Sequence, residues 1–94
     1  MVYVVIEHKV EQRAEFERIF TGDTERRRSM GSKGGRLLVN TKDPDIMFIM
    51  LEWSDKEQAE KFADSLHIEE AWKWASKGIW SRVAVIEDMC EIDA

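Results

Sequence analysis

Residues 46–57 read IMFIMLEWSDKE, an apolar run followed at once by a polar one. The first eight letters are rich in branched and aromatic side chains, which favour a β-strand. The next four, Ser54-Asp55-Lys56-Glu57, match the capping-box pattern S-x-x-E, in which serine and glutamate side chains satisfy helix-start amides. The stretch therefore predicts a strand over 46–53 that leads directly into a helix.

The sequence after residue 57 continues as a helix and then a strand. The predicted helix has a buried stripe with a break near Ser65 and a cap at Gly78, and the stripe consists of Ala59, Phe62, Ala63, Leu66, Ile68, Ala71, Trp72 and Ala75. A last strand is expected over 81–87. The acidic tail MCEIDA after it is expected to fray or to pack on a neighbour.

The sequence before residue 46 supplies a strand, a helix and a second strand. Residues 2–10 are strand-like, and Phe16, Ile19 and Phe20 have helical spacing. That helical stripe is interrupted near 21–23 and reaches Arg27, where an apolar residue would continue it. After the glycine-rich residues 31–35, a strand over 36–40 turns at 42–45 into the strand at 46–53.

The order βαββαβ predicts an α+β, ferredoxin-like fold, with a four-stranded antiparallel sheet and its helices on one face. Both faces of the predicted strands are apolar: Ile46, Phe48 and Met50 alternate with Met47, Ile49, Leu51 and Trp53. The helices can cover only one face, so the other needs a second cover. We expect a homodimer paired through the sheets, with interface residues Met47, Ile49, Leu51, Trp74 and Trp80. A monomer with a ligand-lined open face is the alternative.

Composition limits the class of protein. The 94 residues suit a single domain over 1–94, and 44% of them are hydrophobic. No span for a membrane and no signal peptide are visible, which predicts a cytoplasmic protein without a membrane partner. The net charge of −5 and the lack of exposed aromatics in basic RNP patterns argue against nucleic acid. One cysteine, Cys90, and no histidine pair at helical spacing predict no metal site.

Several strings resemble the dimeric α+β barrel superfamily, in particular its antibiotic-biosynthesis-monooxygenase-like group. The resemblance covers nearly the whole chain, and its residues are Arg28-Ser29-Met30-Gly31, Leu38-Val39, Asp43-Pro44-Asp45, Leu51-Glu52-Trp53-Ser54-Asp55, Ala59, Phe62 and the stretch from Ala75 to Gly78. It implies sheets paired in a dimer, with a cavity between each sheet and its helices. Members that oxidise phenols without a cofactor use asparagine, tryptophan and tyrosine, for which this chain offers only Trp53, Trp72 and Tyr3. Haem-degrading members have an asparagine and a histidine where this chain has His8 and Trp72, so no cofactor is expected.

Candidate site residues follow from chemistry and position. His8 ends the first strand and is the candidate proton-transfer group. The expected ligand-binding residues are Arg36, Phe48, Trp53, Phe62 and Trp72. Five of the fourteen basic residues cluster at 26–28, 33 and 36, where they either neutralise an anion or form a solvated helix face. We expect a small hydrophobic or aromatic ligand without assured catalysis; the alternative is a cofactor-independent monooxygenase or cyclase-like enzyme acting on phenolic or polycyclic substrates.

Overall fold

A computed structural model gives the structure of the chain and describes residues 1–11, 13–65 and 81–94. The elements follow the predicted order, and the helix that was expected to break near residues 21–23 does so, giving α1 and α2. The described elements are β1 (Val2–Lys9), α1 (Arg13–Gly22), α2 (Thr24–Met30), β2 (Ser32–Val39), β3 (Ile46–Trp53), α3 (Lys56–Ser65) and β4 (Ser81–Glu87). Several residues named in the sequence predictions lie outside the described residues, namely Leu66, Ile68, Ala71, Trp72, Trp74, Ala75, Gly78 and Trp80.

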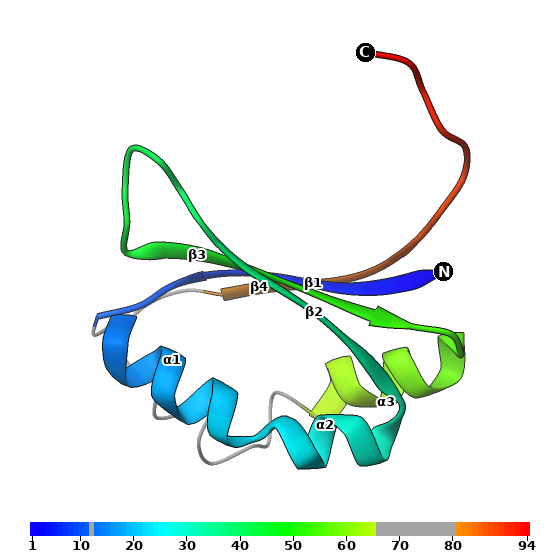
Figure 1. The fold of residues 1–94 in the computed structure, drawn as a ribbon, viewed down its shortest axis with the longest axis horizontal. Coiled ribbons are helices and arrows are strands. Elements are labelled where there is room, and N and C mark those ends of the chain that lie inside the picture. The colour runs from blue at the N-terminus through cyan, green and yellow to red at the C-terminus, as the bar shows by residue number, and fades with distance from the viewer. Residues whose placement is uncertain (12, 66–80) are drawn as a thin grey trace.

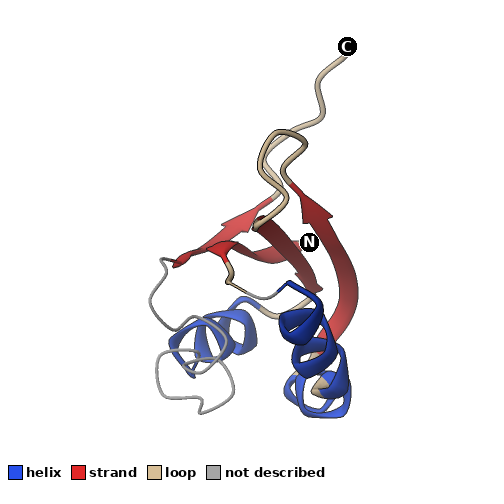
Figure 2. Ribbon diagram, turned by 90° about the vertical axis from the view of Figure 1, so that its left-hand side faces the viewer, coloured by secondary structure: helices blue, strands red, loops and turns tan. Residues whose placement is uncertain are grey.

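The four strands form one antiparallel sheet in the order β2-β3-β1-β4. The described helices all lie on one side of it, and the turn between β2 and β3 and the C-terminal tail project from the other side (Figures 1 and 2). This arrangement confirms the predicted α+β fold with helices on one sheet face.

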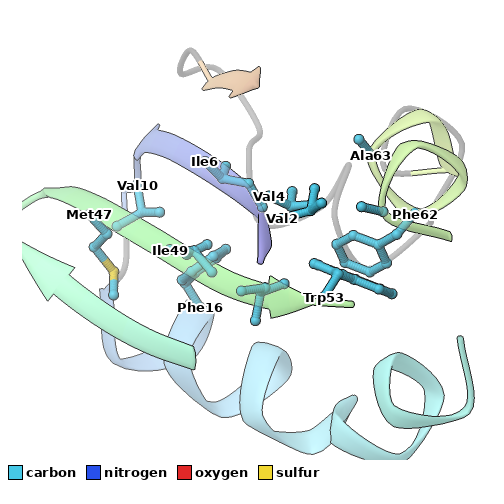
Figure 3. Close-up of a cluster of buried hydrophobic side chains, with 12 residues drawn as sticks. Val2, Val4, Ile6, Val10, Phe16, Met47, Ile49, Trp53, Phe62 and Ala63 are labelled. Atoms are coloured by element: carbon cyan, nitrogen blue, oxygen red, sulfur yellow. The ribbon is translucent and has the colours of Figure 1, made fainter. Parts of the chain in front are cut away.

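The core face of the sheet, as we call the helix-covered side, carries every second residue of β1 and β3. Val4, Ile6, Ile49 and Trp53 are completely buried there. The Trp53 ring lies against the Phe62 ring of α3, with centroids 5.2 Å apart (Figure 3). Burial of this kind contributes about 25 cal/mol for each Å² of apolar surface, so packing on this face stabilises the fold.

The open face, as we call the other side, consists of the intervening residues. Register places Val5 opposite Met50 and Leu38 opposite Phe48. Leu38 is 43% exposed, while Phe48 and Met50 keep part of their surface in water. None of the described residues 1–11, 13–65 and 81–94 forms an element that covers this face (Figure 2).

The assignment of the two faces reverses one expectation. Met47, Ile49 and Leu51 were expected at a dimer interface, but they are at most 4% exposed and belong to the core beneath the helices. A second copy cannot reach them while the helices stay in place. The accessible apolar residues of β3 are Ile46, Phe48 and Met50.

Two boundaries differ from the sequence prediction for local reasons. β2 begins at Ser32, so the glycine-rich residues are part of the strand and contain an irregularity between Ser32 and Gly35. The cap of α3 is the Asp55 carboxylate, which accepts the Glu57 and Gln58 amides at 2.8 and 3.3 Å. Asp55 thus takes the place predicted for Ser54, because α3 begins at Lys56.

Candidate ligand-binding site

A half-open pocket of about 330 Å³ lies between the sheet and the helices, where β2 passes α1 and α2. At this point β2 stays paired with β3 through Ser32 and Trp53 but has an irregularity between Ser32 and Gly35. Gly34 has a φ of +98°, which other residues rarely adopt, and a Cβ on Gly35 would overlap the Met50 carbonyl oxygen. The two glycines therefore let the strand curl toward α2, as Figure 1 shows.

One side of the pocket is apolar. Phe20 reaches it from α1, Leu37 from β2 and Leu51 from β3. Thr21, Thr24 and Ser32 supply hydroxyl groups nearby. A concave site with an apolar wall and a few polar groups is typical of small-molecule binding.

All the charged residues that line the pocket are basic. Four of its twelve lining residues are basic, namely Arg27, Arg28, Lys33 and Arg36, and none is acidic. Arg36 only borders the pocket, because its register opposite Met50 places its side chain on the other face of the sheet. Arg28 is paired with Glu25 at 2.6 Å, whereas Lys33 and Arg36 form no ion pair within the described part of the chain. A chain with a net charge of −5 therefore concentrates positive charge at one hollow.

Arg27 is the most buried of these cations, with 8% of its surface exposed. Its side chain runs back from α2 to the end of α1, where Nη1 donates to the Phe20 carbonyl oxygen at 2.6 Å and Nη2 donates to Thr24 Oγ1 at 3.3 Å. The guanidinium carbon lies 3.9 Å from the centre of the Phe20 ring. All three contacts are to neutral groups, which is unusual for a buried charge.

Burial lowers the pKa of the Arg27 guanidinium, and nearby Asp23 opposes that shift only in part. The Asp23 carboxylate is bonded to Arg26 Nε at 3.0 Å. Since an arginine pKa starts far above neutral, Arg27 stays charged at physiological pH. Its charge therefore lacks a directly bonded carboxylate among the described residues.

The structure divides the residues predicted to bind a ligand between the two sides of the sheet. Trp53 and Phe62 belong to the core face, whereas Phe48 and, by its register opposite Met50, Arg36 belong to the open face. They do not form one site. Arg36 and Gly35 also border a second hollow on the open face, together with Tyr3, Met50 and Glu52.

His8 lies on the core face with Val4 and Ile6, and it is completely buried with its ring 5.0 Å from that of Phe16. It does not line the pocket beside β2. Tyr3 lies on the open face, where its hydroxyl donates to Asp88 Oδ2 at 3.5 Å. Partial burial and then the Asp88 carboxylate raise the pKa of Tyr3, so the phenol stays neutral near pH 7. The structure therefore separates the aromatic and titratable groups of the predicted site.

The described residues contain neither a metal-binding cluster nor a membrane-spanning helix. No three His, Cys, Asp or Glu side chains gather in a group suited to a metal ion within 1–11, 13–65 and 81–94. Within the same residues, none of the helices combines the length and apolar character that a bilayer crossing requires.

Sequence reasoning did not assign Phe20, Leu37 and Arg27 to a common pocket. Phe20 and Arg27 lie at the end of one helical stripe, and the arginine was read as the point where that stripe fails. The structure buries Arg27 at the stripe's continuation instead. The sequence did contain one indication of this arrangement. Arg27 is a charged residue at a position that the helical periodicity predicts to be buried.

Fold and site together define a ferredoxin-like α+β domain with an uncovered apolar sheet face and a basic pocket between sheet and helices. A family model described as "Antibiotic biosynthesis monooxygenase" matches residues 1–74. The chain belongs to this family.

Solved structures with the same fold include a crystal structure titled as an antibiotic biosynthesis monooxygenase, at 16% identity and a TM-score of 0.72, covering 96% of this chain and 100% of that one. A conserved protein from Methanosarcina mazei Go1 has 18% identity and a TM-score of 0.73, with 94% and 92% covered. A dimeric ferredoxin-like protein from an uncultured marine organism has 13% identity and a TM-score of 0.55, with 98% and 92% covered. No curated protein matches the chain. These similarities establish the fold.

Proposed function

We propose that this protein is a homodimer that binds a small, largely apolar molecule in the pocket between β2 and the α1–α2 helices. The observation that carries the binding proposal is the pocket itself, since it combines an apolar wall from Phe20, Leu37 and Leu51 with hydroxyl and cationic groups. Its volume of about 330 Å³ is at the lower end for small-molecule sites, which suits a ligand of one or two rings.

The homodimer proposal rests on the open face. Its accessible apolar residues include Leu38, Phe48, Met50 and Ile86. Apolar patches on a surface often mark protein interfaces, and two-fold homodimers are the commonest oligomers. The dimeric ferredoxin-like structure from the marine organism shares the fold and supports this arrangement. In the proposed dimer the open faces meet through residues such as Phe48 and Met50, while the pocket beside β2 remains on the helix side.

A pocket-filling variant tests the binding proposal. N-phenyl-1-naphthylamine is a neutral aromatic probe whose fluorescence rises in apolar sites. We expect wild type to bind it and Thr21→Trp to lose binding, because residue 21 is exposed and lines the pocket. Glu17→Trp is the matched control, since residue 17 is exposed one turn earlier and does not line the pocket. Equal binding by all three proteins would contradict the proposal.

The family description favours a second candidate function, a cofactor-independent monooxygenase acting on phenols or polycyclic substrates. In that reaction a phenol and O₂ would give a quinone and water, so the substrate supplies all the electrons. The basic pocket supports it, because nearby cations favour the electron-rich phenolate. His8 would need an approach for substrate other than the pocket beside β2.

Oxygen uptake with naphthols and quinols separates the two functions. An enzyme would consume oxygen faster than the uncatalysed reaction and would lose that activity in Thr21→Trp. If His8 transfers the proton, His8→Ala would also slow the reaction, whereas an equal rate would remove the histidine from the mechanism. A rate no higher than that without protein would leave binding as the function.

A further inference from the structure

The charge of the pocket identifies the class of ligand more closely than its shape does. Arg27 and Lys33 line one hollow, and neither of them forms an ion pair within the part of the chain that the structure describes. Placing like charges together is unfavourable unless something of opposite charge joins them. No lining residue is acidic, so this chain's pocket does not supply that charge.

Arg27 gives the strongest indication, because it is buried. A guanidinium has five N–H groups, and the described residues accept two of them, through the Phe20 carbonyl and Thr24 Oγ1. Burying a charge without a counter-ion is costly, and a bound anion would offset that cost at the pocket wall. Lys33 lies on the same pocket from the opposite side, on β2.

Arg27 also has a structural role that has to be separated from binding. Its bond to the Phe20 carbonyl satisfies an acceptor in the last turns of α1, where helix carbonyls lack partners. This role explains one hydrogen bond but does not explain why Lys33 of β2 lines the same hollow. Lys33 is exposed and forms no hydrogen bond among the described residues, so it reports on the ligand without that complication.

We propose that the ligand is an organic anion, whose carboxylate, sulfonate or phosphate group lies beside Arg27 and Lys33 and whose apolar body lies against Phe20, Leu37 and Leu51. This inference rests on the proposed function, since it names the ligand class for the same pocket. Charge-assisted hydrogen bonds between guanidinium and such oxyanions are among the strongest in proteins.

Two probes with the same aromatic body test the inference. The first, 8-anilinonaphthalene-1-sulfonate, carries a sulfonate, and the second, N-phenyl-1-naphthylamine, lacks it. We expect Lys33→Gln to weaken sulfonate binding about fivefold and Arg27→Met about tenfold or more, with less than about a twofold change for the neutral probe. Arg18→Gln is the control for lost charge, because Arg18 is exposed and lies outside the pocket.

Each outcome has a distinct meaning. Selective loss of sulfonate binding in Lys33→Gln, with binding of both probes blocked by Thr21→Trp, supports the anion. If Lys33→Gln and a folded Arg27→Met change neither probe, or change both equally, the anion inference fails while the pocket stands. If Arg27→Met fails to fold, Lys33→Gln decides alone. If neither probe binds wild type, or Thr21→Trp blocks neither, the proposed function and the inference fail together.

Discussion

The two faces of β3 are built largely from apolar residues, yet they have opposite surroundings. Ile49 on the core face is completely buried, and its neighbour Phe48 on the open face is not. Consecutive residues of a strand point to opposite sides, so a single position decides between helix cover and exposure. The apolar character of a strand face therefore predicts that the face is covered. It does not predict whether a helix or another molecule covers it.

The largest effect should come from placing a charge on the core face. Ile49→Asp buries a carboxylate among Phe16, Leu51 and other apolar side chains, and that cost approaches the total stability of about 5–15 kcal/mol expected for a domain. We expect the variant to show no cooperative unfolding transition by circular dichroism. A native-like transition would mean that the core face is misassigned.

The same substitution one residue earlier should leave the fold intact. Phe48→Asp places its carboxylate on the open face, so the monomer can keep its core. If the open faces pair, the dimer dissociation constant should rise about a hundredfold or more, as expected for loss of a buried aromatic residue at an interface. Sedimentation velocity at several protein concentrations measures it. A folded Phe48→Asp with unchanged association would contradict pairing through this face.

The sequence predicted the order of elements, the apolar nature of both faces of β3 and, to within one residue, the start of α3, because these depend on spacing within short segments. It did not assign the faces correctly, because β3 is equally apolar on both. The information lay in β1, where Glu7 and Lys9 mark the face away from the core, and register places Glu7 opposite Phe48. Register between distant strands is a tertiary property that periodicity within one strand does not contain.

The pocket was harder to predict for a related reason. It depends on the bend of β2, which arises where Gly35 approaches the Met50 backbone, fifteen residues away in sequence. The basic cluster was recognised in the sequence, whereas its position beside Phe20 and Leu37 required the fold. Local sequence patterns thus indicated a basic site, but they did not indicate where in the fold it lies.

Glycine substitutions in β2 test whether the close packing and backbone conformation of this strand stabilise the region around the pocket. Gly35→Ala should lower the free energy of unfolding by about 1–3 kcal/mol, since its Cβ would overlap the Met50 carbonyl. Gly34→Ala should cost about 1–2 kcal/mol, because the new residue would keep a positive φ in otherwise open space. Urea denaturation measures both.

Gly22→Ala is the control for this series. Nothing lies within 4 Å of a Cβ at residue 22, and its φ is not positive. We expect no loss of stability, and a gain of about 0.4–1 kcal/mol is consistent with fewer unfolded conformations. A larger loss for Gly22→Ala than for Gly35→Ala would show that close packing of β2 does not shape this region.

The smallest effect is expected from an ion pair at the rim of the open face. The Asp43 carboxylate accepts the Asp45 amide at 3.1 Å and Lys9 Nζ at 3.2 Å. The backbone hydrogen bond first, and then Lys9, lower the pKa of Asp43 below its usual value. A carboxylate whose pKa is depressed by folding stabilises the protein above its unfolded pKa, and this contribution is lost as the pH falls through the folded value.

Both groups are well exposed, so we expect only a slight change in stability, confined to acid pH. The sharper measurement is an NMR titration of the Asp43 carboxyl carbon. Lys9→Gln should move its pKa upward but leave it below the usual value, because the Asp45 amide still donates. If the pKa of Asp43 returned fully to its usual value in Lys9→Gln, the whole shift would be due to the lysine. The Asp45 amide would then not be the larger cause of the shift.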